Sequence, residues 1–326
     1  MNVLVTGGAG YIGSVVVEML LQQGFFVVVV DSLTEGHRSA ISSDITFFKE
    51  DIGDREVIIG ILDDHKIDAV IHMAGETLVS KSMTHPEDYF ITNVAKGIEL
   101  LEAMRETGTK RIIFSSTAAL FGNPEFTPIT EEHPTNPINA YGRSKLMFEQ
   151  MLEWYGRVHD LTYVCLRYFN AAGATAEHGE HHPVETHLIP IVLQTALGQR
   201  EYVEIYGTDY DTKDGTCVRD YIHIEDLANV HIGALRKMDE IGSQKLNLGN
   251  GEGYSVKEVI EAAREITGHP ITARESDRRS GDPGTLVATS ERTHTLIGVK
   301  FKYPDINQIV QAAWNWHSKN PNGYKD

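Results

Sequence analysis

The first thirty residues show a change in hydrophobic periodicity that predicts two strands with a helix between them. Residues 3–5 and 25–30 are short apolar runs rich in valine, the pattern of strands that are buried on both faces of a parallel sheet. Between them, residues 14–23 place apolar side chains three to four positions apart, as a helix requires. Gly24 follows directly, as expected just past a helix C-terminus. The chain therefore begins with a strand–helix–strand unit.

The same alternation continues through the first half of the chain. A long helix is predicted from about Tyr141 to Asp160, because its apolar positions recur with helical spacing. We therefore expect an α/β fold built on a Rossmann-type doubly wound parallel sheet. Further buried strands are predicted at residues 46–48, 69–73, 111–114 and 163–169.

A glycine-rich turn joins the first strand to the first helix. Gly7, Gly10 and Gly13 have the spacing of a dinucleotide-binding turn, which lets the backbone approach a pyrophosphate at the helix N-terminus. Asp31 ends the second strand, about 20 residues later, where a carboxylate accepts hydrogen bonds from an adenosine ribose. Its charge would repel a 2′-phosphate, so NAD is favoured over NADP.

Small and polar residues follow three other predicted strands. Asp51 and Ile52 lie after the strand at 46–48, at the carboxyl edge where doubly wound sheets bind ligands. Ala74 and Gly75 follow the strand at 69–73, and small residues there allow a flat cofactor to lie against the backbone. Hydroxyls at residues 115–117 follow the next strand; ordinary turn formation is the alternative explanation for them.

Tyr141 and Lys145 are four residues apart in the predicted long helix and so lie on one face. An ammonium beside a phenol favours the phenolate and lowers the phenol pKa, which would make Tyr141 a proton shuttle at neutral pH. A solvated helix face produces the same spacing by chance. The dinucleotide signal at the N-terminus favours the catalytic interpretation.

The strict alternation stops at about residue 171, where proline, glycine and histidine become frequent. We expect residues 1–170 to form the NAD-binding domain and residues 171–326 to form mainly a smaller mixed α/β substrate lobe. A short strand and a helix at about 220–250 are expected to return to the first domain. The two domains are therefore not expected to be separated by one boundary position in the chain.

Composition narrows the possible partners. The chain has 326 residues and a formal net charge of −17, which argues against nucleic-acid binding. Its two cysteines, Cys165 and Cys217, are expected to be buried thiols in a reducing compartment. No apolar run approaches the roughly 20 residues that span a bilayer, and no leader segment is evident. We expect a cytoplasmic protein with no membrane or nucleic-acid partner.

Together these motifs resemble the extended short-chain dehydrogenase/reductases. Downstream segments narrow the resemblance to the UDP-glucose 4-epimerase family, and the match covers nearly the whole chain. The segments are Arg167–Gly173, His187–Pro190, Asp214–His223, Asn247–Gly249 and Arg278–Pro283.

The resemblance implies epimerisation at C4 of a UDP-hexose, interconverting UDP-glucose and UDP-galactose through a transient 4-keto sugar. Tyr141 would exchange the C4 hydroxyl proton, Lys145 would assist it and Thr117 would orient the C4 oxygen. NAD would be tightly bound and regenerated in each turnover. The implied NAD contacts are Gly7, Gly10, Tyr11, Ile12, Gly13, Asp31, Asp51, Ile52, Ala74, Gly75, Asn93, Ser115, Tyr141, Lys145 and Phe169. The implied substrate contacts are Thr117, Asn170, His187, Leu188, Tyr206, Arg219, Arg279 and Asp282.

Three alternatives would use the same scaffold, and the sequence favours them to different extents. A nucleotide-sugar dehydratase carries an Asp-Glu pair after the catalytic Thr, where this chain has Ala118 and Ala119. A UDP-N-acetylglucosamine or UDP-glucuronate 4-epimerase of the same family would share the scaffold, and Leu286 occupies the position that gates bulk at the sugar C2. A non-catalytic NAD-sensing regulator would be expected to lack Tyr141 or Lys145, and both are present.

Some residues depart from the family pattern or invite another interpretation. Glu76 and Thr77 lie where some epimerases place a lysine near the cofactor phosphate. Phe121 replaces a common tyrosine, and some relatives have asparagine at the position of His187. Histidines at 178, 181, 182 and 187 could suggest a metal site, but their loop shows no orderly ligand spacing, so no metal is expected. The resemblance also implies a homodimer formed through helices near Asp88–Arg105 and Tyr141–Arg157.

Overall fold

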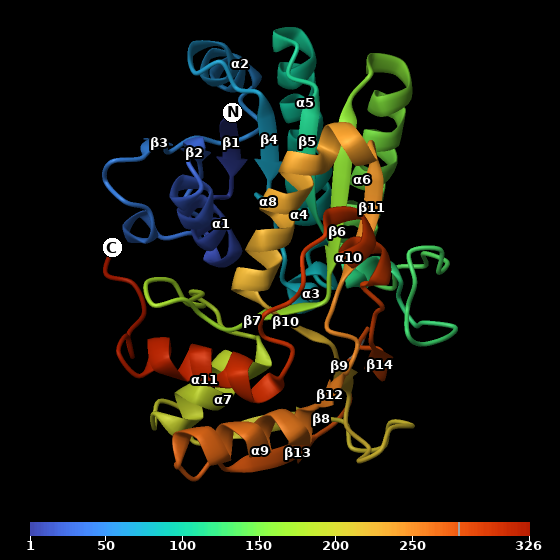
Figure 1. Ribbon diagram of the computed structural model, residues 1–326. Coiled ribbons are helices and arrows are strands. Elements are labelled where there is room, and N and C mark those ends of the chain that lie inside the picture. The colour runs from blue at the N-terminus through green and yellow to red at the C-terminus, as the bar shows by residue number, and fades with distance from the viewer. Residues whose placement is uncertain (280) are drawn as a thin grey trace.

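A computed structural model describes residues 1–279 and 281–326 (Figure 1). Its centre is a sheet of seven parallel strands in the order β11-β6-β5-β4-β1-β2-β3. This arrangement confirms the expected α/β class with a doubly wound parallel sheet. The strands are β1 (Asn2–Thr6), β2 (Phe26–Val30), β3 (Thr46–Phe48), β4 (Ala69–His72), β5 (Arg111–Thr117), β6 (Thr162–Tyr168) and β11 (Gln244–Leu248).

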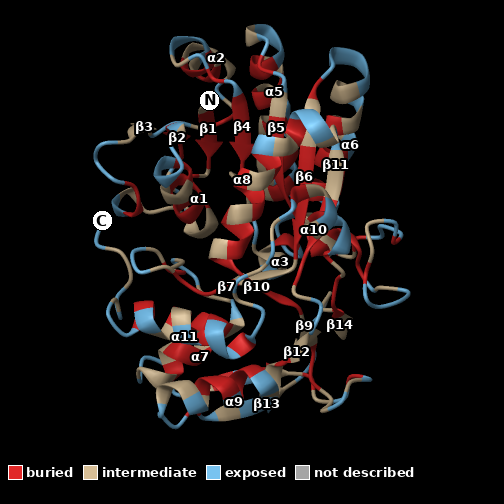
Figure 2. Cartoon of the chain, viewed as in Figure 1, coloured by how far each residue is buried: buried red, intermediate tan, exposed pale blue. Residues whose placement is uncertain are grey.

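Helices cover both faces of this sheet, because alternate strand residues point to opposite sides. Val3 and Val5 pack in one core with helices α1 and α8, whereas Leu4 packs in a second core with α2, α5 and α6. Figure 2 shows the strands buried and the outer helix surfaces exposed. The covering helices are α1 (Tyr11–Gln22), α2 (Arg55–Asp64), α5 (Lys96–Thr107), α6 (Ala140–His159) and α8 (Ile224–Ile241).

Short elements connect the larger ones around the sheet. A π-helical segment, Phe90–Ala95, leads into α5 and packs on α6. The strand predicted at 111–114 continues to Thr117, because Ser115, Ser116 and Thr117 also pair with β6. The remaining short helices are α3 (Val79–Ser82), α4 (Pro86–Tyr89), and 3-10 turns at Arg38–Ala40 and Ala118–Leu120.

A smaller lobe is built around a third core, from helices α7, α9 and α11 and the strand pair β8–β13. It lies below the sheet in Figure 1. Its helices are α7 (Leu188–Ala196), α9 (Val256–Thr267) and α11 (Ile306–His317), and its strands are β8 (Val203–Tyr206) and β13 (Ala273–Ser276). The short strands that link lobe and sheet are β7 (Asn170–Ala172), β9 (Val218–Arg219), β10 (Tyr221–His223), β12 (Tyr254–Ser255) and β14 (Thr285–Leu286). Helix α10 (Glu291–Ile297) packs on α8 and β11.

Residues 220–250 pass back to the sheet after the first visit to the lobe. β10 pairs with β7, α8 packs against α1, and β11 pairs with β6 as the edge strand. The buried Asp220 carboxylate fixes this crossing by accepting hydrogen bonds from the backbone N–H groups of Asn250, Gly251 and Ala288. The chain therefore runs between sheet and lobe more than once.

No helix within residues 1–279 or 281–326 has the length and apolar character needed to span a bilayer.

Candidate active site

A cavity of about 640 Å³ lies at the carboxyl edge of the sheet and receives residues from both parts of the fold. One of its walls is the turn between β1 and α1. Gly13 packs directly on Gly7, so that a Cβ at position 13 would overlap the Gly7 carbonyl oxygen. The N-terminus of α1 has no side-chain cap and no acidic residue in its first turn. Its N–H groups are therefore available to the pyrophosphate of a dinucleotide, which fits NAD.

Asp31 is held in place beside this turn. Its carboxylate accepts hydrogen bonds from the backbone N–H groups of Ala9 at 2.9 Å and Leu33 at 2.8 Å. Burial raises the pKa of Asp31, and these two hydrogen bonds partly offset the rise. The residue lines the cavity.

Asp51 also lines the cavity, and it is paired with a residue that sequence reasoning missed. Lys96, at the start of α5, places its ammonium 2.5 Å from the Asp51 carboxylate and lines the same cavity. Burial raises the pKa of Asp51, but hydrogen bonds from Lys96 and from the Gly53 N–H outweigh it and leave the pKa below its ordinary value. Lys96 therefore supplies a positive charge at this edge of the cavity. The carboxylate of Glu76 is paired with a different lysine, Lys81.

The start of helix α6 brings Tyr141 to Thr117 at the end of β5. Asn139 caps the helix by accepting a hydrogen bond from the Gly142 N–H at 2.8 Å. Gly142 lies directly on the backbone of Ala119, where a Cβ would overlap the carbonyl oxygen. This close approach places the first turn of α6 against the turn that follows Thr117, and both Tyr141 and Thr117 line the cavity.

The direction in which the pKa of Tyr141 is shifted differs from the sequence-based expectation. The Lys145 ammonium is buried and donates a hydrogen bond to the Ser115 carbonyl oxygen at 3.0 Å. Burial raises the pKa of Tyr141, and a hydrogen bond with Thr117 opposes that rise. Burial lowers the pKa of Lys145 to about 8. The prediction that Lys145 depresses the tyrosine pKa is therefore wrong, because desolvation dominates.

The opposite end of the site has basic and polar groups. Arg219 in β9 pairs with the Asp282 carboxylate at 2.8 Å, and both line the cavity together with Asn170, Leu188 and Leu286. Guanidinium groups are suited to phosphate oxygens. Ser280, in the segment Arg278–Pro283 whose pattern indicated this region, lies outside the described residues.

The structure brings most of the predicted site residues together. Among the described residues, three of the expected contacts are not part of the cavity lining. Asn93 is buried and bonds to the backbone of Glu76 and to the Ser144 hydroxyl. Arg279 stacks on the ring of Tyr206, 3.8 Å from its centroid. The predicted site residues that do line the cavity are Gly7, Gly10, Tyr11, Ile12, Gly13, Asp31, Asp51, Ile52, Ala74, Gly75, Ser115, Thr117, Tyr141, Lys145, Phe169, Asn170, His187, Leu188, Arg219 and Asp282.

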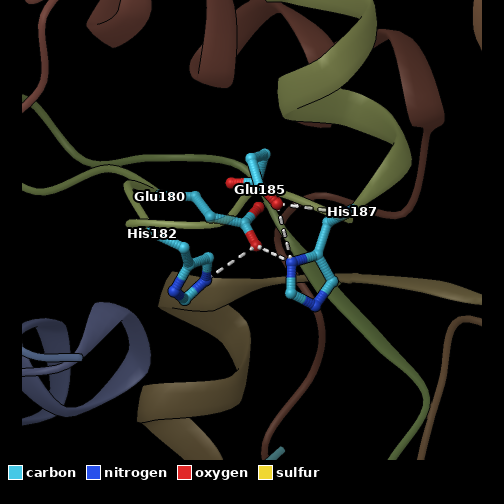
Figure 3. A group of neighbouring side chains, drawn as sticks. All are labelled: Glu180, His182, Glu185 and His187. Atoms are coloured by element: carbon cyan, nitrogen blue, oxygen red, sulfur yellow. Dashed lines mark hydrogen bonds and ion pairs between the residues drawn. The ribbon is translucent and has the colours of Figure 1, made fainter. Parts of the chain in front are cut away.

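His187 belongs to a group that the sequence did not reveal. It lies just before α7 and contacts the carboxylates of Glu180 and Glu185, and His182 contacts Glu180 (Figure 3). A sequence signal for this group was nevertheless present: a glutamate is followed two positions later by a histidine at both 180/182 and 185/187. Residues two positions apart lie on the same face of an extended backbone, so the members of each pair can lie close together.

These features define a dinucleotide-dependent enzyme of the epimerase and dehydratase class. The chain matches the NAD dependent epimerase/dehydratase family over residues 3–249 and belongs to that family. It is an enzyme that uses NAD, and the expected cofactor is confirmed. The match to a catalytic family disfavours the NAD-sensing regulator.

The resemblance to UDP-glucose 4-epimerases is also confirmed. A relative of that name from Halalkalibacterium halodurans is 53% identical over 99% of this chain and 98% of its own length. A crystal structure of a UDP-glucose 4-epimerase superposes with a TM-score of 0.97 at 47% identity, covering all of both chains. The Bifidobacterium longum enzyme in complex with NAD+ and UDP has a TM-score of 0.95 at 38% identity, covering 99% of this chain and 100% of its own.

Proposed function

We propose that this chain interconverts UDP-glucose and UDP-galactose by NAD-dependent inversion at C4 of the sugar. The observation that carries the proposal is the position of Tyr141 beside Thr117, on the wall of a cavity that the glycine turn and Arg219 also line. Incubation of the protein with UDP-galactose should yield UDP-glucose, measured by chromatography of the nucleotide sugars. Unchanged UDP-galactose would refute the proposal.

Tyr141, Thr117 and Lys145 are assigned to proton transfer at the C4 oxygen. Tyr141 takes the C4 hydroxyl proton and later returns it, while Thr117 orients the same oxygen. Lys145 is anchored on the Ser115 carbonyl and holds positive charge at this wall. The turn at 118–120 places Ala118 and Ala119 where a dehydratase has acids, so no acid is supplied there to expel water.

The glycine turn, the α1 N-terminus and Asp31 are assigned to NAD. Bound NAD supplies a hydride acceptor and donor at C4, and its oxidised ring adds a positive charge that favours the phenolate form of Tyr141. Asn170 and Arg219 are assigned to the substrate diphosphate. An anchor at the diphosphate lets the sugar turn within the cavity while the nucleotide stays fixed, so binding energy from a remote group serves the reaction.

The purified protein is expected to carry NAD and to convert UDP-galactose with no NAD added, because each turnover regenerates the cofactor. Nucleotide released by acid denaturation and separated by chromatography should be NAD at about one per chain. A strict requirement for added NAD, with net accumulation of NADH, would indicate a dehydrogenase instead.

Leu286 is expected to limit the substrates that enter. It is a buried residue of β14 that lines the cavity and packs with Ala118, Phe121 and Leu146. Leu286→Ala should raise the rate on UDP-N-acetylgalactosamine relative to UDP-galactose by about tenfold, since relief of one steric contact is worth about 1–3 kcal/mol. The measurement is the ratio of kcat/KM for the two substrates. The control is Val287→Ala, at a neighbouring buried position outside the cavity lining. If Val287→Ala changed the kcat/KM ratio by the same factor, Leu286 would not be the residue that limits the substrates.

We also propose a homodimer formed through α6 and the segment 88–105. Trp154 and Val158 are 62% and 63% exposed and lie one turn apart on α6, and Ile91 on the adjoining π-helical segment is 54% exposed. Large exposed apolar side chains on two elements that pack together are consistent with an interface. Trp154→Glu should shift the molecular mass measured by light scattering from dimer to monomer, whereas Phe126→Glu should not. A wild-type monomer would refute the proposal.

A cytoplasmic location is proposed on the basis of Cys165 and Cys217, which are buried free thiols in this fold.

A further inference from the structure

The loop between β7 and α7 gathers four groups that can each donate one atom to a metal ion. Glu180, His182, Glu185 and His187 place these atoms within 4.8 Å of one another (Figure 3). The two carboxylate side chains are 5% and 4% exposed. Two imidazoles and two carboxylates form a mixed N and O donor set of the kind that Zn²⁺ accepts in protein sites.

Three of the six separations between the donor atoms are close to those of a tetrahedron. Glu180 Oε1 lies 2.9 Å from His187 Nδ1 and 3.3 Å from His182 Nε2, and Glu185 Oε1 lies 3.0 Å from His187 Nδ1. Zinc bonds of about 2.0–2.1 Å require tetrahedral donor atoms about 3.3 Å apart. The other three donor pairs lie within 4.8 Å, so the side chains would draw inward around a bound ion.

The charge around the loop also favours a cation at this position. Glu180, His182 and His187 line the same cavity that is assigned to NAD and to a UDP-sugar, each of which carries two phosphates. The ring of Tyr11, in the glycine turn, lies against His182 with centroids 6.5 Å apart. The Glu180 carboxylate on the wall of this cavity would repel phosphates, and a divalent cation would offset that charge.

We propose that Glu180, His182, Glu185 and His187 bind one Zn²⁺ ion that fixes the 180–187 loop against the N-terminus of α7. This assignment revises two sequence-based expectations: that the histidines of this loop serve no metal, and that the His187 side chain contacts the substrate. The ion is structural: all four protein donors are used, which leaves no position open for substrate. The charge argument rests on the proposed nucleotide-sugar function, whereas the donor geometry stands without it.

The test is zinc binding by the full-length protein with its NAD retained. After treatment with a chelator, the protein is titrated with ZnCl₂ in calorimetry, with MgCl₂ as the comparison. We expect one Zn²⁺ per chain and no response to Mg²⁺. Cobalt(II) added to the same protein should give the intense visible absorption of a tetrahedral site. Failure to bind stoichiometric zinc, or a weak octahedral cobalt spectrum, would overturn the proposal and leave a metal-free network of protonated histidines and glutamates.

Variants then locate the site. His182→Gln and Glu180→Gln each remove one donor and should raise the dissociation constant for Zn²⁺ at least about 100-fold, since loss of an outer-sphere partner alone costs 10- to 100-fold. His181→Gln is the matched control, because His181 is the adjacent loop histidine and its ring contacts His37 instead. Equal zinc affinity in all three variants would place the metal elsewhere and refute the assignment. UDP-galactose conversion, measured in parallel on the untreated wild type, tests the proposed function separately.

Discussion

Tyr141→Phe should lower the turnover number by about 10²- to 10⁴-fold, the contribution expected of a positioned general acid–base group. The substitution removes one hydroxyl, whose identified partner among the described residues is Thr117. The phenyl ring keeps its packing, including its edge-to-face contact with Tyr89. We therefore expect unchanged unfolding behaviour and unchanged NAD content, with the loss confined to kcat for UDP-galactose.

The control for this variant is Tyr155→Phe on the same helix. Tyr155 donates a hydrogen bond to Glu102 on the α5 side, away from the cavity. It should retain turnover within about twofold, as a surface substitution does. If Tyr141→Phe retained turnover to the same extent, Tyr141 would be removed from the mechanism.

Arg167→Met should destabilise the protein by about 3–5 kcal/mol, because it leaves a buried carboxylate without its main partner. Glu149 is fully buried and Arg167 is 3% exposed, and their two hydrogen bonds measure 2.9 and 2.6 Å. Ser116 donates a further hydrogen bond to Glu149 at 2.6 Å. The pair thereby joins α6 to strands β5 and β6, and the measurement is the free energy of unfolding in urea with NAD at a fixed concentration.

A double substitution separates the strength of this ion pair from the cost of isolating one charge. Glu149→Leu together with Arg167→Met should be less destabilising than the sum of the single changes, since no buried charge remains. Asp239→Asn, which disrupts the exposed ion pair with Arg111, should cost under about 1 kcal/mol. If Arg167→Met lowered the free energy of unfolding no more than Asp239→Asn does, burial would add nothing to the strength of the Glu149–Arg167 ion pair.

Strands were predicted well wherever apolar periodicity alone determines them. The strands predicted at 46–48 and 69–73 coincide with β3 and β4 to within one residue. The extension of β5 through Thr117 was not predicted, because its hydroxyl residues also suit a turn and only their pairing with β6 makes them strand. Helix α1 likewise starts at Tyr11, earlier than its apolar pattern indicates, since the glycine turn forms its N-terminus.

The candidate site was predictable where one local motif supplies it, and less so where distant segments meet. The glycine turn, Asp31, Thr117 and Tyr141 follow from local patterns and line the cavity as expected. The pairing of Lys96 with Asp51 depends on how α5 packs, so no spacing indicates it. The raised pKa of Tyr141 was missed for a related reason: burial is a property of the assembled fold, whereas the four-residue spacing reports only proximity.

The edge position of β11 has a consequence for how the protein is made. The sheet gains its last strand, and helix α8 on its face, from residues 224–248, far beyond β6. A ribosome adding about 5–20 residues per second delivers them on the order of ten seconds after β6. During that interval the nascent chain presents an unpaired strand edge and an uncovered apolar face. Chaperone protection in this interval, more than the stability of the finished fold, is then expected to set the yield of soluble protein during rapid expression.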